Sequence, residues 1–349
     1  MSRLDDALAL VAIDSVSGGE ATIAHHVAVV VGRNLDLDVE RIGDNVVART
    51  TGHHATRLLV AGHLDTVPGD ASAATIVGDE LRGVGACDMK GSLSVMLELA
   101  STPTTRSVEV TWVFYAREEI SRSDSGLLEI AELRPELLDA DAAILAEPTN
   151  GRVEAGCQGT LRVTVEMTGA RAHTARPFVG RNAIHRLGDV ITKVASYEPR
   201  ATVIDGIEFV EQLQVVDIVG GVAPNVVPDR ASCTLNHRVA PDRTKDEAVS
   251  WLIEFLAEVT DEGDTVRVVD WAPSSPPSMA NERLTTLVEL TGEAPLGKVG
   301  WTDVATFAEL KIPATNFGAG DPLLAHRSDE FVTLAQLDQF ATVLTAWLQ

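Results

Sequence analysis

The sequence predicts an α/β fold in which a larger domain, built on a largely parallel mixed sheet, carries an inserted ferredoxin-like domain. Strand-like and helix-like segments alternate in the first half of the chain, which is typical of a parallel sheet. The middle of the chain has the order β-α-β-β-α-β, and strand and helix signals return after it. With 349 residues, 45% of them apolar, the chain can bury a large core and is long enough for two domains.

The elements of the larger domain follow from apolar runs and from helical periodicity. Segments 57–65, 107–119 and 141–149 are apolar runs with polar boundaries, the pattern of buried strands. Segment 91–101 has the apolar spacing of a helix, and segment 333–349 has that of an amphipathic helix.

The inserted domain is predicted between Gly159 and a Pro- and Ser-rich segment that begins at Ala272. Asn182 and Thr244 are candidate N-caps of its two helices. The larger domain therefore takes residues 1–158 and 272–349, and the inserted domain takes residues 159–271. The predicted strands of the inserted domain are 160–169, 208–220, 231–241 and 264–270, and its predicted helices are 182–197 and 244–260.

Charge and cysteine content narrow the class of protein. The chain has 51 acidic and 28 basic residues, a formal net charge of -23, which disfavours nucleic acid or an anionic membrane as a partner. Cys87, Cys157 and Cys233 are far apart and form no CxxC, so we expect a reducing cytoplasm and no disulfide framework. Residues 1–20 predict an amphipathic helix and not a signal peptide, and no apolar run approaches the ~18 residues of a membrane span.

Polar side chains that could bind a metal or move a proton follow several predicted strands. His63 and Asp65 end the first strand and, being two residues apart, point the same way. An imidazole can bind a divalent metal while a carboxylate orients it, although a surface His–Asp pair is an equal alternative for these two residues alone. Further candidates at strand ends, in a Gly-rich turn and late in the chain are Asp88, Glu118, Glu119, Glu147 and His326.

Taken together, these residues favour a metal site. In open α/β sheets, ligands bind beyond the carboxyl ends of the strands. Two histidines with several carboxylates suit zinc, cobalt or manganese, although each residue taken singly could be a turn, cap or surface residue. Residues 83–91 read GxGxxD and not GxGxxG, and no P-loop lysine follows, which disfavours a dinucleotide or phosphate loop. No HExxH motif is present either.

The same motifs resemble the M20 family of dinuclear metallopeptidases and amidohydrolases over nearly the whole chain. The resemblance rests on HLDTVP, GxGxxDMKG, the Glu-Glu pair, AEPT and HRSDE in this order, and on RAHTARP, GRNAI and NVVPD in the inserted domain. It implies a zinc-peptidase-like catalytic domain and an inserted lid domain. Within the family, GCQGTLRV, GWTD and NFGAGDPLLAHRSDE most resemble the enzymes that desuccinylate succinyl-diaminopimelate.

The resemblance also implies roles for the candidate residues. One zinc, or cobalt, would be held by His63, Asp88 and Glu147, and a second by Asp88, Glu119 and His326, so that Asp88 bridges the two ions. Asp65 would orient His63, and Glu118 would be the general base. Two ions about 3.5–4 Å apart can share and activate a water, which agrees with this division of roles.

His173 in RAHTARP is the candidate donor to the oxyanion of the reaction. The resemblance implies that this histidine reaches the active site of the neighbouring subunit, so we expect a homodimer formed through the lid domain. Arg238 is the candidate that grips a substrate carboxylate. Asn225, Thr302, Gly318 and Gly320 match substrate-binding positions of the family, although Trp301 stands where many relatives have Thr.

The expected function is hydrolysis of the succinyl amide of N-succinyl-LL-2,6-diaminopimelate by a cytoplasmic, metal-dependent amidohydrolase. One alternative is another M20 deacylase or dipeptidase, such as an acetylornithine deacetylase. A second is a non-catalytic binding module on the same fold, which would show a broken set of ligands. A nicotinamide-dependent dehydrogenase is disfavoured by the missing GxGxxG.

Overall fold

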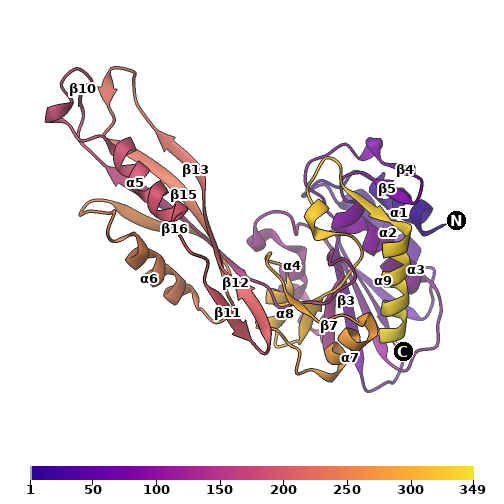
Figure 1. The fold of residues 1–349 in the computed structure, drawn as a ribbon. Coiled ribbons are helices and arrows are strands. Elements are labelled where there is room, and N and C mark those ends of the chain that lie inside the picture. Colours follow the sequence, from indigo (N-terminus) through magenta and orange to yellow (C-terminus); the bar gives the residue numbers. More distant parts are fainter. Residues whose placement is uncertain (1) are drawn as a thin grey trace. The chain divides into compact units, whose positions relative to one another are not determined.

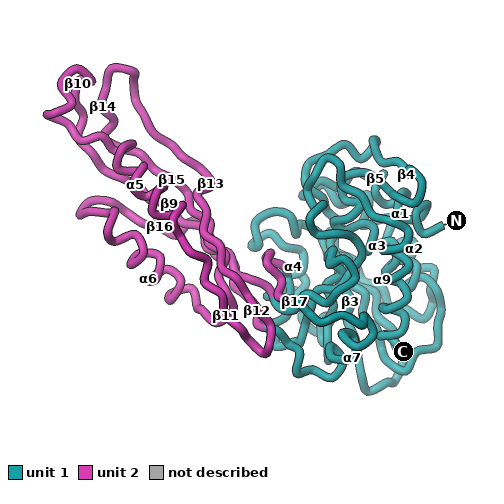
Figure 2. The backbone as a smooth tube through the Cα atoms, in the orientation of Figure 1, with its two compact units in different colours: residues 1–156, 277–296, 303–349 teal, residues 157–276, 297–302 magenta. Residues whose placement is uncertain are grey.

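The computed structural model describes residues 2–349, which form two compact units (Figure 2). Unit 1 comprises Met1–Gly156, Pro277–Leu296 and Asp303–Gln349, and unit 2 comprises Cys157–Pro276 and Gly297–Thr302. Among residues 2–349, no helix is long and apolar enough to cross a membrane.

Unit 1 is built on a mixed sheet with the strand order β1-β2-β6-β3-β7-β18-β8-β17. Figure 1 labels β3 and β7 of this sheet. Its four central strands β6, β3, β7 and β18 run parallel, and β2 and β8 flank them antiparallel. The predicted α/β class with a mixed sheet is therefore confirmed, and among the described strand pairs of this sheet parallel pairing is confined to the four central strands. The strands are β1 (Leu37–Ile42), β2 (Asn45–Thr50), β3 (Arg57–His63), β6 (Glu109–Tyr115), β7 (Ala142–Leu145), β8 (Glu154–Ala155), β17 (Leu296–Gly297) and β18 (Ala314–Asn316), with β4 (Thr75–Val77), β5 (Glu80–Arg82) and β19 (Phe331–Thr333) in a small separate sheet.

Helices cover this sheet because its central strands are apolar on both faces. Every residue of β6 is buried, and β3 is buried from Leu58 onward. Side chains that alternate along these strands, such as Leu58 and Val60, share one core with residues of α1, α2, α3, α7 and α9. The helices of unit 1 are α1 (Arg3–Val11), α2 (Ala21–Val31), α3 (Gly91–Ser101), α4 (Gly126–Leu133), α7 (Glu282–Thr291), α8 (Val304–Glu309) and α9 (Leu334–Trp347).

Unit 2 has the element order β9-α5-β13-β15-α6-β16 and an antiparallel sheet with the strand order β13-β15-β9-β16. This is the split βαβ topology of a ferredoxin-like fold. Alternate residues of the strands pack under α5 and α6, which leaves the other face of the sheet open. The elements are β9 (Gly159–Thr168), β10 (Ala172–His173), α5 (Ala183–Ala195), β11 (Ala201–Ile204), β12 (Ile207–Val210), β13 (Gln212–Gly220), β14 (Val226–Val227), β15 (Arg230–Val239), α6 (Lys245–Leu256) and β16 (Thr265–Ala272).

The single strand predicted over 208–220 is wrong, because β12 ends at Val210 and β13 begins at Gln212. Between them lies Glu211, a fully buried carboxylate that accepts hydrogen bonds from Arg200, Arg243 and the amide of Ala240. The chain turns away from the sheet there to bury this carboxylate among its donors. β12 instead pairs with β11, the two strands being joined by the residues Asp-Gly with positive φ, which favour a tight hairpin.

The boundaries of unit 2 also differ from the predicted 159–271. The unit begins at Cys157, ends at Pro276 and gains Gly297–Thr302, which we had placed in the larger domain. Two hydrogen bonds explain why Gly297–Thr302 belongs to unit 2. The amide of Gln158 donates to the Lys298 carbonyl at 3.2 Å, and Trp301 Nε1 donates to the Pro273 carbonyl at 3.0 Å. Neither contact leaves a periodic signal in the sequence.

Candidate metal centre

The parallel strands of unit 1 bring the candidate ligands together. His63 is the last residue of β3, whose neighbours β6 and β7 run parallel to it. Glu118 and Glu119 follow β6, and Glu147 follows β7. Because the carboxyl ends of parallel strands meet at one edge of a sheet, these side chains converge there. Asp88 joins them from a short irregular helical turn, Ala86–Lys90, which precedes α3.

Short contacts link the candidate ligands. His63 Nε2 lies 3.0 Å from Asp88 Oδ1 and 3.9 Å from Glu147 Oε1. His326 Nε2 lies 2.9 Å from Glu119 Oε1 and 3.4 Å from Asp88 Oδ2. The two oxygens of Asp88 thus face one histidine each. His63 and His326 are far apart in the sequence, in its first fifth and near its end. All five residues proposed as metal ligands belong to one cluster.

The donor set fits divalent cations. One ligand atom each from His63, Asp88 and Glu119 lie within 4.8 Å of one another. Carboxylates packed so closely are stabilised by nearby positive charge. Hydrogen bonds to Asp88 and Glu119 accordingly raise the pKa of His326 to about 10. Burial lowers the pKa of His63, but Asp65 and Asp88 raise it by more. Imidazole nitrogen and carboxylate oxygen are the donors that zinc and similar ions accept.

Glu118 directly precedes the proposed ligand Glu119 and is half-buried. Burial, together with the nearby carboxylate of Glu147, raises the pKa of Glu118 well above its usual range. A carboxyl group with a raised pKa beside a nucleophile is suited to accept and return a proton. The direction of this pKa shift agrees with a base at Glu118, and the contact of Glu119 with His326 at 2.9 Å agrees with a ligand there, while both roles stay predictions.

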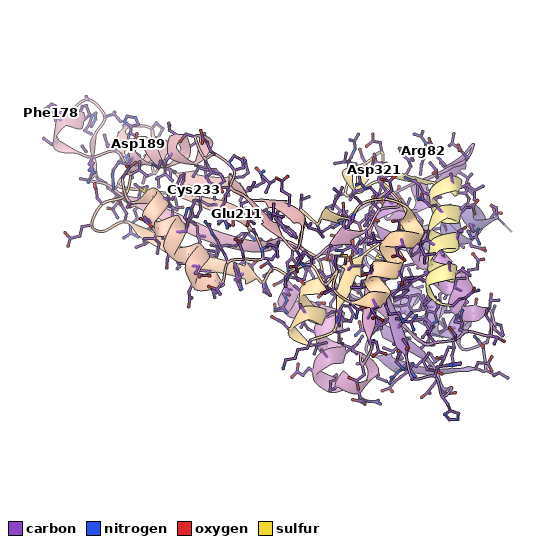
Figure 3. All side chains as sticks on the ribbon, turned by 60° about the horizontal axis from the view of Figure 1, so that its bottom comes forward. Arg82, Phe178, Asp189, Glu211, Cys233 and Asp321 are labelled. Atoms are coloured by element: carbon purple, nitrogen blue, oxygen red, sulfur yellow. The ribbon has the colours of Figure 1, made fainter. Side chains whose placement is uncertain are left out.

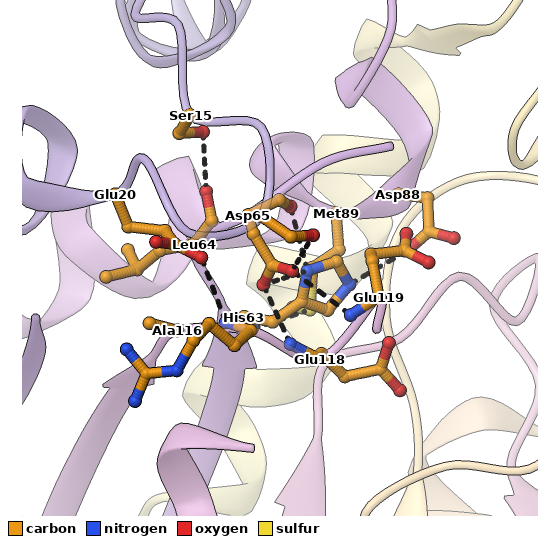
Figure 4. A network of polar contacts seen from close by, with 12 residues as sticks. Ser15, Glu20, His63, Leu64, Asp65, Asp88, Met89, Ala116, Glu118 and Glu119 are labelled. Carbon is orange, nitrogen blue, oxygen red and sulfur yellow. Dashed lines mark hydrogen bonds and ion pairs between the residues drawn. The ribbon is translucent and has the colours of Figure 1, made fainter. Parts of the chain in front are cut away.

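Asp65 makes contacts that the sequence does not indicate. Its Oδ1 accepts a hydrogen bond from the amide of Glu118 and its Oδ2 one from the amide of Glu119, both at 3.0 Å (Figure 4). Ser17 Oγ also donates to Oδ2, at 2.7 Å. The hydrogen bond of His63 Nδ1, at 3.0 Å, goes to the backbone carbonyl of Asp65, and the carboxylate lies 3.6 Å away. Asp65 thus holds the backbone of Glu118 and Glu119 as well as facing the His63 ring.

Gly318 and Gly320, predicted to bind substrate, are both buried. A Cβ atom at Gly318 would lie 2.2 Å from the Ala146 carbonyl oxygen, and one at Gly320 would lie 2.5 Å from Cys87 Sγ. Gly320 also has a φ of 97°, which favours glycine. Both glycines therefore let the chain pass close to the segments that carry Glu147 and Asp88, and substrate contact by them stays a prediction.

The remaining predicted site residues lie in unit 2. His173 pairs with Val226 between the short strands β10 and β14, and the Asn225 carbonyl accepts a hydrogen bond from the Thr174 amide at 3.1 Å. His173 and Asn225 thus lie together, both exposed. The same loop exposes Phe178 (Figure 3).

Arg238 and Thr302 have different surroundings. Arg238 lies on β15, and its Nη1 donates to Thr160 Oγ1 at 2.6 Å. Among residues 2–349 it forms no ion pair with a carboxylate, so its guanidinium keeps donors for a ligand. Thr302 is buried, and its carbonyl accepts a contact from Cys157 Sγ at 3.6 Å.

Two buried charged residues next to the cluster received no role from the sequence. Lys90 is 1% exposed, and its Nζ donates to the Ile13 carbonyl at 2.7 Å. Glu330 is 1% exposed and accepts from the amides of Cys87 and Asp88. Lys90 belongs to the motif DMKG and Glu330 to the motif HRSDE, both of which the sequence analysis used. Their place in these motifs, as charged residues without an assigned role, is the sequence feature that could have identified them.

Residues 59–349 match the model of peptidase family M20/M25/M40. The chain belongs to this family. The resemblance drawn from the motifs is confirmed, and the M20 protein is a hydrolase.

Curated relatives extend the match to 97% of the chain. A succinyl-diaminopimelate desuccinylase of Corynebacterium glutamicum is 40% identical over 347 residues, covering 97% of this chain and 94% of the relative. A Mycobacterium tuberculosis protein, provisionally named as a desuccinylase of the same substrate, is 43% identical over 343 residues, covering 97% of this chain and 96% of the relative.

Solved structures share the fold at low identity. A tripeptidase of Staphylococcus aureus has a TM-score of 0.78 at 21% identity, covering 99% of this chain and 96% of its own. A dinuclear metal-binding M20 peptidase of Bacillus subtilis has a TM-score of 0.68 at 15% identity, covering 99% and 96%. The M20 fold thus extends over both units of the chain.

Proposed function

We propose that this M20 protein hydrolyses the succinyl amide of N-succinyl-LL-2,6-diaminopimelate to succinate and LL-diaminopimelate. One observation carries the proposal: 40% identity over 97% of the chain to a succinyl-diaminopimelate desuccinylase. The intact cluster of histidines and carboxylates supports catalysis over a binding role, because a non-catalytic module has no use for a half-buried base with a raised pKa beside metal ligands.

The proposed cofactor is a pair of divalent ions, zinc or cobalt. His63, Asp88 and Glu147 would hold one ion, and Asp88, Glu119 and His326 the other. When bound, such ions activate water as a nucleophile and polarise the amide carbonyl of the substrate.

The chain itself supplies proton transfer and positioning in this proposal. Glu118 takes the proton that the attacking water loses and delivers it to the departing amine of diaminopimelate. Asp65 keeps Glu118 in place through the amide hydrogen bond at 3.0 Å. Arg238 binds a carboxylate of the substrate, and Thr302 is a further proposed substrate contact. Asn225, which lies beside His173, is proposed to act with it in the partner's site. The cationic side chain and the metals offset the net charge of -23 where the anionic substrate binds.

The test compares N-succinyl-LL-diaminopimelate with N-acetylornithine, using protein treated with a chelator and then reloaded with zinc. We expect kcat/KM for the succinyl substrate to be higher by about tenfold or more. Activity should vanish with the chelator and return with two zinc ions per chain. A preference for N-acetylornithine would favour the alternative deacylase, and binding of either compound without turnover would favour a binding module.

We also propose a homodimer through unit 2, in which His173 serves the partner's active site. β13 is an edge strand of its sheet, and its Val216, Ile218 and Val219 are each more than half exposed. Two such edges can pair about a two-fold axis into one continuous sheet, which removes the exposed backbone groups. The exposed position of His173 is compatible with a role outside its own chain.

Mixing two impaired variants tests this arrangement. Glu118→Gln and His173→Ala, denatured together and refolded, should recover about a quarter of wild-type kcat, because half of the dimers are mixed and each mixed dimer has one complete site. Each variant alone supplies the baseline. Failure to recover activity, with dimers present by sedimentation, would place His173 in the site of its own chain.

A further inference from the structure

Glu330 links the two segments that carry Asp88 and His326. It lies four residues after His326 and immediately before β19. Its carbonyl accepts a hydrogen bond from the Gly83 amide at 3.0 Å, and β19 pairs with β5 just beyond. The backbone of Glu330 is therefore joined to the start of the Gly-rich turn that leads to Asp88.

The side chain of Glu330 reaches the same turn from within the core. Its Oε1 accepts from the Cys87 amide at 2.7 Å and from the Asp88 amide at 2.9 Å. Asp88 turns its own carboxylate toward His63 and His326. A buried carboxylate that accepts two amide hydrogen bonds forms strong, directional contacts, so it determines where the backbone of Asp88 lies.

A second buried carboxylate acts in the same manner. Asp65 accepts hydrogen bonds from the amides of Glu118 and Glu119, both at 3.0 Å. Asp65 and Glu330 therefore each hold a segment that carries proposed ligands, and neither of them is itself a proposed ligand.

We propose that Glu330 is a positioning residue of the metal centre: it holds Asp88 in the orientation that bridges two cations. The inference rests on the proposed metal-dependent function but concerns metal binding, not substrate choice. Outer contacts of this kind orient a ligand before the metal arrives, and their loss commonly lowers metal affinity by about 10- to 100-fold.

The test is zinc binding to metal-free protein, measured by calorimetry for wild type, Glu330→Ala and Glu330→Gln. We expect Glu330→Ala to weaken zinc affinity about tenfold. Glu330→Gln keeps an acceptor oxygen but loses the charge, so it should weaken affinity less, about threefold. The matched control is Asp329→Asn, one residue away, where an exposed carboxylate pairs with Arg327 and affinity should not change.

Two further readouts separate positioning from general stability. The Tm of each metal-free variant shows whether the fold is intact, and kcat should fall more than KM rises once zinc is saturating. Wild-type zinc affinity in a folded Glu330→Ala variant would overturn the proposal, and if that variant does not fold, wild-type affinity in Glu330→Gln would do so. Because zinc is the probe, failure of the desuccinylase assay leaves this result interpretable.

Discussion

Glu118→Gln should lower kcat about a thousand-fold while leaving zinc content and KM nearly unchanged. Glutamine has the same size and can accept hydrogen bonds through its oxygen, but it cannot take up the proton that the attacking water releases. The amide of Glu118 would still donate to Asp65, so the backbone should stay in place. Steady-state kinetics with N-succinyl-LL-diaminopimelate measure kcat and KM, and metal analysis of the same preparation measures the zinc content.

The adjacent variant Glu119→Gln is the matched control. The carboxylate of Glu119 contacts His326 at 2.9 Å, as expected of a ligand. Glu119→Gln should therefore lower the zinc content of the protein, and its loss of kcat should follow from the lost zinc. Glu118→Gln would thus lose kcat but keep zinc, whereas Glu119→Gln would lose zinc. A Glu118→Gln protein that lost metal, or that kept more than about a tenth of wild-type kcat, would contradict the assignment of the base.

Asp65→Asn should lower kcat about 100-fold, although the substitution is nearly isosteric. The two carboxylate oxygens of Asp65 accept from two different amides, those of Glu118 and Glu119. Asparagine has one acceptor oxygen, and its NH2 group would face an amide N–H as donor against donor. At least one of the two residues should therefore shift, and zinc content should fall when that residue is Glu119.

Ser17→Ala provides the comparison for Asp65. It removes one donor to Asp65 Oδ2 but leaves both amide contacts, so we expect a loss of less than about tenfold in kcat. If Asp65 acted solely by orienting the His63 ring, Asp65→Asn would retain much of the activity, since the ring nitrogen already bonds to the backbone carbonyl. Near-wild-type kcat and zinc content in Asp65→Asn would refute the positioning role.

Much of the metal centre could be predicted from the sequence, because apolar runs followed by polar residues mark where buried strands end. An apolar run that ends in His63, and others that end in Glu119 or Glu147, predict buried parallel strands that deliver ligands to one edge of a sheet. A Gly-rich turn and a late histidine had already made Asp88 and His326 candidates, and the motif resemblance supplied their roles as ligands. The structure brings all five residues together.

Other features could not be predicted because they depend on single long-range contacts. Glu330 meets the amide of Cys87 across 243 positions of sequence, and no periodicity records that meeting. Glu211 reads as one residue of a continuous strand, yet it is buried and interrupts that strand, because Arg200, Arg243 and the Ala240 amide surround it.

The sequence by itself determined the α/β class, the inserted ferredoxin-like order and the kinds of side chain at the metal centre, because these depend on local periodicity and on residue type. The tertiary structure decided which amide each buried carboxylate accepts from, and hence that Asp65 and Glu330 hold the ligand segments in place. The physical reason is that a hydrogen bond forms only when donor and acceptor lie about 3 Å apart to within a few tenths of an ångström, and the packing of distant segments sets that distance.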